Sequence, residues 1–265
     1  MSTNAIALCK SVVVLTTIVL TQAVPPSVVA RSSQEVVSQI TATEFFERGV
    51  ARYQRGDKQG AIADFTQAIR LNRNHALAYY NRGVVRFRIG NNLTEAIADF
   101  TQAIRINPEY VDAYYNRAIA RVKVQQYWPA IDDVTQVISL DPSHDRAFYL
   151  RGLIYSENLK DYQTGINDFT EAIRLNPRNP APYFKRGNAR YRIGDRERAI
   201  DDYNKAIDIN PSDPEPYYNR SISRYQIGDR QGAIFDLQKS ADLYLDLGNF
   251  EKYQKAIDTL EKFEN

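Results

Sequence analysis

The hydrophobic positions of this chain recur with the period of an α-helix, in short stretches that come in pairs. In one pair, Tyr79 and Gly83 are four residues apart in the first stretch, and Ala96 and Phe100 are four apart in the second. Gly90 lies between the two stretches, where a left-handed residue ends one helix before the next begins. The pattern predicts two amphipathic helices joined by a tight turn.

This pair of helices recurs six times. Each unit carries a pentamer like YYNRG (79–83) in its first helix and one like AIADF (96–100) in its second. The units span 42–75, 76–110, 111–144, 145–179, 180–213 and 214–247, so four have 34 residues and two have 35. A repeat of this length predicts a stacked array in which no single helix pair is stable alone.

The segments that flank the six units have different patterns. Residues 1–30 resemble an export signal, with a short polar start, about ten apolar residues and small-residue cleavage sites near Ala23 or Ala30. The apolar run is short for a membrane span, and an uncleaved membrane anchor is the alternative. Residues 31–41 are expected to be a linker, and 248–265 a C-terminal capping helix that begins after Gly248.

The repeated signature resembles that of the tetratricopeptide repeat family. Tyr79, Gly83, Ala96, Phe100 and Pro108 match the family's spaced positions, and the six units cover about three quarters of the chain. The repeat sequence is similar to that of bacterial members of the family that have several repeats and an N-terminal export signal. The resemblance implies an all-α fold, a right-handed superhelical solenoid of six helix pairs with the capping helix at its end. It also implies a concave face lined by the first helix of each unit.

Every unit keeps one arginine in its first helix and one aspartate in its second. The arginines are Arg48, Arg82, Arg117, Arg151, Arg186 and Arg220, and the aspartates are Asp64, Asp99, Asp133, Asp168, Asp202 and Asp236. A second arginine follows four residues later in five units, with Tyr155 in the remaining one. Two arginines at this spacing repel each other unless an acid lies between them.

We therefore expect an internal ladder in which each aspartate bridges arginines of its own or the neighbouring unit and fixes the register between units. The alternative is two solvated charged faces that never meet. A partly buried pair adds little net stability, but removal of one partner is costly.

The second aromatic of each pentamer is expected in the concave groove, because the resemblance places that position there. These aromatics are Phe46, Tyr80, Tyr115, Tyr149, Phe184 and Tyr218. The same face is expected to carry the polar side chains of Asn81, Asn116, Asn188, Asn219, Arg88, Lys123 and Arg192. A groove of rings with a polar rim suits an extended peptide or a partner helix. Packing of the rings between units is the alternative.

Composition narrows the function classes. The chain has 34 basic and 32 acidic residues, so no nucleic-acid partner is expected. Cys9 is the only cysteine, which excludes a disulfide framework and a cysteine metal cage. His75 and His144 lie at unit junctions, where they are expected to cap helices rather than to catalyse.

No cofactor, metal site or small-molecule substrate is expected, and the chain is not expected to be an enzyme. The prediction is a non-catalytic protein–protein interaction scaffold that works outside the cytoplasm, in the periplasm, the thylakoid lumen or the exterior. The alternatives are a self-assembling structural array and an RNA-binding helical repeat. Membrane attachment is expected only if the N-terminal segment stays uncleaved.

Overall fold

The computed structural model describes residues 40–90 and 92–264, and this part of the chain is built from helices without strands. The predicted signal (1–30) and most of the predicted linker lie outside the described residues. None of the described helices is long and apolar enough to cross a membrane. The fold is an all-α helical repeat solenoid.

One helix pair falls within each of the six expected units. The first helices are α1 (Ala42–Gln54), α3 (Ala76–Ile89), α5 (Val111–Lys123), α7 (Asp145–Leu153), α9 (Pro180–Arg192) and α11 (Pro214–Gln226). The second helices are α2 (Lys58–Leu71), α4 (Leu93–Ile106), α6 (Tyr127–Leu140), α8 (Tyr162–Leu175), α10 (Arg196–Ile209) and α12 (Arg230–Asp246). A final helix, α13 (Phe250–Glu264), packs on α12.

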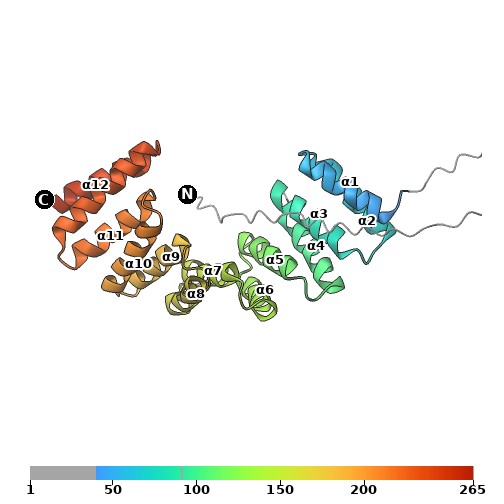
Figure 1. Ribbon diagram of the computed structural model, residues 1–265, viewed down its shortest axis with the longest axis horizontal. Coiled ribbons are helices and arrows are strands. Elements are labelled where there is room, and N and C mark those ends of the chain that lie inside the picture. Colours follow the sequence, from blue (N-terminus) through green and yellow to red (C-terminus); the bar gives the residue numbers. More distant parts are fainter. Residues whose placement is uncertain (1–39, 91, 265) are drawn as a thin grey trace, which may run out of the picture.

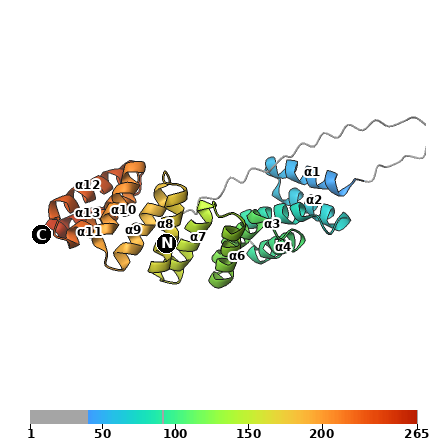
Figure 2. The ribbon, with the colours of Figure 1, turned by 60° about the horizontal axis from the view of Figure 1, so that its bottom comes forward.

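The helices stack in chain order into an elongated, bent array (Figures 1 and 2). In Figure 1 the helices α5, α7 and α9 follow the inner side of the bend, and α6, α8 and α10 follow its outer side. We call the side lined by the first helices the inner face. Because each helix contacts only its near neighbours in the chain, the first helices of the six units line the inner face one after another.

The two helices of a unit cross where a glycine meets an aromatic ring. A Cβ atom added to Gly83 would lie 2.9 Å from the ring of Phe100, and one added to Gly187 would lie 2.7 Å from the ring of Tyr203. Gly49 and Gly152 face phenylalanines in the same way. In the two other units the residue at the position of the ring is smaller, since Ala118 and Val134, and Ser221 and Leu237, hold the equivalent positions. The small residue is therefore larger in the units where its partner is smaller.

The fourth unit contains one of the extra residues at the end of its first helix, before the turn. The insertion widens the helix there into a π-helical turn, η1 (Ile154–Asn158). Ser156 lies in this turn, is buried, and donates a hydrogen bond to the carbonyl of Gly152 at 2.7 Å. The wider turn is possible because a single insertion in a helix is accommodated by bonds to the fifth residue back.

The turn within each unit passes through the left-handed region. Gly56, Gly90, Gly194 and Gly228 take φ values between 83° and 90°, whereas Gln125 and Lys160 hold the equivalent position with φ of 62°. A side chain in this region places Cβ close to the following carbonyl oxygen, which costs about 1–2 kcal/mol.

Replacement of Gln125 by glycine is therefore expected to stabilise the third unit by about 0.5–1 kcal/mol, the relief of strain being partly offset by the entropy of glycine in the unfolded chain. Urea denaturation followed by circular dichroism measures the change. Gln102→Gly, in the interior of α4, is the control and should destabilise by about 1 kcal/mol. Equal destabilisation by both variants would contradict the assignment of strain to Gln125.

Candidate functional site

The arginine of each pentamer is paired with the aspartate of its own unit. Their closest nitrogen–oxygen distances lie between 2.6 and 2.8 Å in all six units. The aspartates are almost fully buried, which is unusual for a carboxylate without a partner. The second arginine reaches the same aspartate at 2.7–3.3 Å in five units, and in the fourth unit Tyr155 replaces it.

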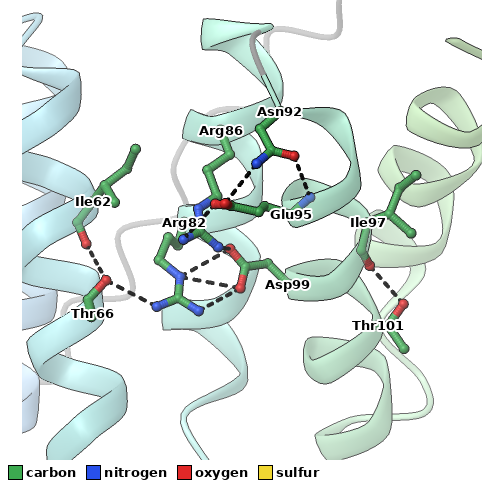
Figure 3. A network of polar contacts seen from close by, with 9 residues as sticks. All are labelled: Ile62, Thr66, Arg82, Arg86, Asn92, Glu95, Ile97, Asp99 and Thr101. Carbon is green, nitrogen blue, oxygen red and sulfur yellow. Dashed lines mark hydrogen bonds and ion pairs between the residues drawn. The ribbon is translucent and has the colours of Figure 1, made fainter. Parts of the chain in front are cut away.

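Contact with the neighbouring unit is made by a hydroxyl group instead of the aspartate. Arg82 donates from its terminal nitrogen to Oγ1 of Thr66, on the second helix of the preceding unit, at 3.0 Å (Figure 3). The hydroxyl of Thr66 donates in turn to the carbonyl of Ile62, so its oxygen is oriented as an acceptor. Three further arginines donate in the same way to Thr101, Thr135 and Thr170, and in the sixth unit Arg220 donates to the amide oxygen Oδ1 of Asn204.

Each arginine therefore joins two units, by an ion pair within its own unit and a hydrogen bond to the one before. Arg48 belongs to the first unit and has no preceding helix among the described residues, and its side chain is 41% exposed. Sequence reasoning missed the threonines, although a hydroxyl recurs two residues after the aspartate in four units. The first aromatic of each pentamer also contacts this arginine, as in Tyr79, whose ring centroid lies 5.6 Å from the guanidinium carbon of Arg82.

The second aromatics pack deeper than the sequence indicated. Tyr80 and Tyr115 are only 8% exposed and belong to the largest apolar cluster. The ring of Tyr80 lies 5.9 Å from that of Phe100 in its own unit and 4.8 Å from that of Tyr110 at the junction with the next. These two rings, which the sequence placed in the groove, are therefore packed mainly within the array, against the junction residues Tyr110 and His144 at the ends of their own units.

The remaining second aromatics keep part of their surface exposed, and they are Phe46, Tyr149, Phe184 and Tyr218. Tyr149 packs against Phe169 at 5.9 Å, and burial raises the pKa of its hydroxyl, which stays protonated. These four rings therefore offer an edge to a partner while their faces stabilise the array.

In the first three units, an aromatic residue at the junction after the second helix packs against the second aromatic of the pentamer. His75 lies 5.0 Å from the ring of Phe46, and its Nδ1 accepts the backbone N–H of Ala78 as the N-cap of α3. Burial lowers the pKa of His75, so the neutral form is the one that the fold stabilises. The cap is complete above the unfolded-state pKa of about 6.5 and is lost as pH falls through the lower folded-state value.

We expect the stability of the chain to fall below about pH 6.5 by up to about 2 kcal/mol from this cap. In His75→Asn the amide keeps an acceptor at the N-cap and does not titrate. That variant should lose less stability than the native chain over the same pH window, measured by thermal unfolding at pH values from 7.5 downward. Identical pH profiles of the two proteins would contradict the role given to His75.

The asparagines of the predicted site are used within the array. Asn116 donates to the hydroxyl of Tyr80 in the preceding unit at 3.0 Å, and Asn219 donates to Oδ1 of Asn188 in the preceding unit at 2.8 Å. Asn188 also accepts from the hydroxyl of Tyr203. Asn81 donates to the carbonyl of Leu77 on its own helix. These amides therefore connect neighbouring helices or bond back to a carbonyl of their own helix.

Three cations of the predicted site remain open to solvent on the inner face. The guanidinium carbon of Arg88 lies 5.9 Å from the ring centroid of Tyr53, and Nζ of Lys123 lies 5.8 Å from that of Phe87, each ring belonging to the unit before. Arg192 is also exposed. The equivalent residue of the fourth unit, Glu157, is paired with Lys185. This position is therefore positive in three units, negative in the fourth, and neutral in the first and the last.

Two further features of the described residues concern ions and hollows. These residues hold no group of three histidine, cysteine or acidic side chains that could bind a metal ion. A hollow between α8 and α11 is lined by Arg186, Arg190, Asp202 and Arg220, which are already committed to the ladder, and by the solvent-facing Lys205.

Family models match the same stretches that the structure builds from helix pairs. A model described as TPR repeat matches residues 49–90, 86–125 and 187–228, and one described as tetratricopeptide repeat matches 145–179. Together these stretches cover more than half of the chain. The chain belongs to the tetratricopeptide repeat family, whose members are generally non-catalytic scaffolds for protein–protein interaction.

Solved structures with the same fold share little sequence with this chain. MamA from Desulfovibrio magneticus RS-1 is 22% identical, with a TM-score of 0.61 over 64% of this chain and 96% of that one. YrrB, described as a TPR protein with an unusual peptide-binding site, is 21% identical, with a TM-score of 0.60 over 72% and 97%. PilF from Pseudomonas aeruginosa is 18% identical, with a TM-score of 0.64 over 81% and 96%. No curated protein matches the chain.

Proposed function

We propose that this protein is a non-catalytic scaffold that holds an extended peptide or a partner helix along its inner face, outside the cytoplasm. The observation that carries the proposal is a contrast between two sets of repeated positions. The arginine and aspartate of the ladder are the same in all six units, whereas the position of Arg88 holds Lys123, Glu157, Arg192 and then Gln226. A constant frame that displays variable charges is suited to discriminate among partners.

The partly exposed rings add contact area beside these charges. Phe46, Tyr149, Phe184 and Tyr218 come from four different units, so an extended segment along the inner face would meet them in succession. Aromatic edges provide apolar contact at a low entropic cost. The peptide-binding site named for YrrB is consistent with this use of the fold.

Export is proposed from the N-terminal sequence alone. Residues 1–30 combine a single lysine, an apolar run and alanines at two cleavage positions, a pattern typical of bacterial signal peptides. Determination of the N-terminal residue of the protein isolated from a cell envelope fraction tests this. A new N-terminus after Ala23 or Ala30 is expected, and an intact Met1 in a cytoplasmic fraction would contradict export.

Partner capture from envelope and lumen fractions tests the inner face. Because Tyr80 and Tyr115 are core residues, the test uses exposed cations instead, in the triple variant Arg88→Glu, Lys123→Glu, Arg192→Glu. The matched control is Arg70→Glu, Arg105→Glu, Arg174→Glu, which changes the charge equally on exposed positions of second helices. Circular dichroism checks that both variants fold.

A partner that the native chain and the control retain, and that the inner-face variant loses, supports the proposal. A partner retained by all three proteins would contradict it. Binding of generic RNA that weakens steeply as the salt concentration rises would favour the RNA-binding alternative. A molecular mass of the protein that grows with its concentration would favour self-assembly.

A further inference from the structure

The turn between α12 and α13 exposes an unusual group of apolar side chains. Leu245, Leu247 and Phe250 are 47%, 66% and 69% exposed, and they lie within six consecutive residues. No other six-residue stretch of the described chain holds three large apolar side chains with comparable exposure. Single exposed apolar residues are ordinary, but a contiguous group marks an interaction surface.

This turn is built differently from the five junctions before it. The other second helices are 14 residues long and end at Leu71, Ile106, Leu140, Leu175 and Ile209, whereas α12 has 17 residues and runs on to Asp246. The additional length carries Leu245 beyond the point at which the earlier helices stop. The surface is therefore peculiar to the C-terminal end of the array.

The apolar side chains stand on an ordered frame. Tyr244 is buried and packs with Tyr253 and Ala256 of α13. The backbone N–H of Asn249 donates to the carbonyl of Tyr244 at 2.8 Å, and the Asn249 side chain accepts the N–H of Lys252 as the cap of α13. A surface that is held in place loses little entropy when it binds.

Acidic side chains surround the group. Asp242, Asp246 and Glu251 are exposed, and no ion pair among the described residues uses any of them. Lys252, the next cation along the chain, is paired with Glu215 on α11. We call these six residues the C-terminal tip: the apolar Leu245, Leu247 and Phe250, and the three acids around them, whose negative charge no ion pair neutralises.

We propose that the C-terminal tip is a second docking surface, separate from the inner face, and that it binds a partner segment whose apolar side chains are flanked by lysine or arginine. The negative rim selects this occupant by charge. A second copy of the chain would bring like charges together, and an anionic lipid surface would be repelled in the same way. A flanking cation on a peptide would instead meet Asp242, Asp246 or Glu251.

Fluorescence anisotropy of the full-length chain with two labelled peptides tests this proposal. Both peptides have about twelve residues and alternate leucine or phenylalanine with a charged residue, which is lysine in one and glutamate in the other. The protein variants are Leu247→Ser with Phe250→Ser, and Asp246→Lys with Glu251→Lys. Leu71→Ser is the matched control, since Leu71 is 58% exposed but stands alone at the end of α2.

The native chain should bind the lysine peptide and not the glutamate peptide. The serine double variant should bind it about tenfold more weakly, the control should bind it as the native chain does, and the lysine double variant should prefer the glutamate peptide. Equal weakening by Leu71→Ser, or no effect of either tip variant, would overturn the proposal. The proposal would also be overturned if the native chain self-associated with rising concentration and the serine variant did not, or if the tip bound anionic vesicles. Either result would mean that the tip binds a different occupant.

Discussion

Asp133→Ala is expected to destabilise the array by about 3–5 kcal/mol, because it leaves two arginines without their anion. Asp133 is 2% exposed, and it accepts from Arg117 at 2.6 Å and from Arg121 at 2.7 Å. Arg117 is itself only 9% exposed, so water cannot replace the lost carboxylate without opening the interface between the third unit and the second. Urea denaturation followed by circular dichroism measures the loss.

The first unit provides the matched comparison. Asp64 makes the same contacts, but the side chains of Arg48 and Arg52 are 41% and 36% exposed, so solvent screens the charges when the acid is removed. Asp64→Ala should therefore cost about 1 kcal/mol or less. Equal losses in the two variants would show that burial of the arginines does not set the strength of the ladder.

Gly83→Ala is the second large effect expected, a destabilisation of about 1–3 kcal/mol from overpacking at the helix crossing. The new Cβ would lie 2.9 Å from the buried ring of Phe100, which has no free space to move into. Alanine is otherwise the better helix former by about 1 kcal/mol, so a net loss of stability isolates the steric term.

The third unit suggests the compensating change, because it combines Ala118 with Val134. Phe100→Val alone should leave a cavity and destabilise, whereas the double variant Gly83→Ala, Phe100→Val should be less destabilised than the sum of the two single variants by about 1 kcal/mol or more. Thermal unfolding of the four proteins completes the cycle. Additive losses of stability would mean that the residue at position 83 and the ring at position 100 are not coupled.

The sequence was sufficient to predict the helix pairs and the partners within a unit. Each unit repeats an arginine and an aspartate at fixed places, and an acid must lie close to Arg82 and Arg86 if the two are not to repel each other. In the structure Asp99 forms ion pairs with both. The helix termini also followed from local chemistry, since Asp57, Asp195 and Asp229 cap second helices in the same way.

Contacts between units were harder to predict, because a pattern within one helix does not say how far the next unit reaches. Tyr80 lies on the side of α3 that faces the groove in the resemblance, yet Tyr110 at the end of its own unit packs on it and Asn116 of the next unit donates to its hydroxyl. Thr66 is similar: its hydroxyl is ordinary in a helix until Arg82 of the next unit lies within 3.0 Å. Repetition of the hydroxyl in four units was the available signal.

The role of the inner face is tested most directly by photo-crosslinking at single positions. Benzoylphenylalanine is introduced in place of Arg88 in one full-length variant and in place of Phe235, which is exposed on α12, in another. Each is irradiated with the partner captured from the envelope fraction. The account predicts a covalent partner adduct from position 88 and none from position 235. Adducts of equal yield from both positions, or from position 235 alone, would contradict binding along the inner face.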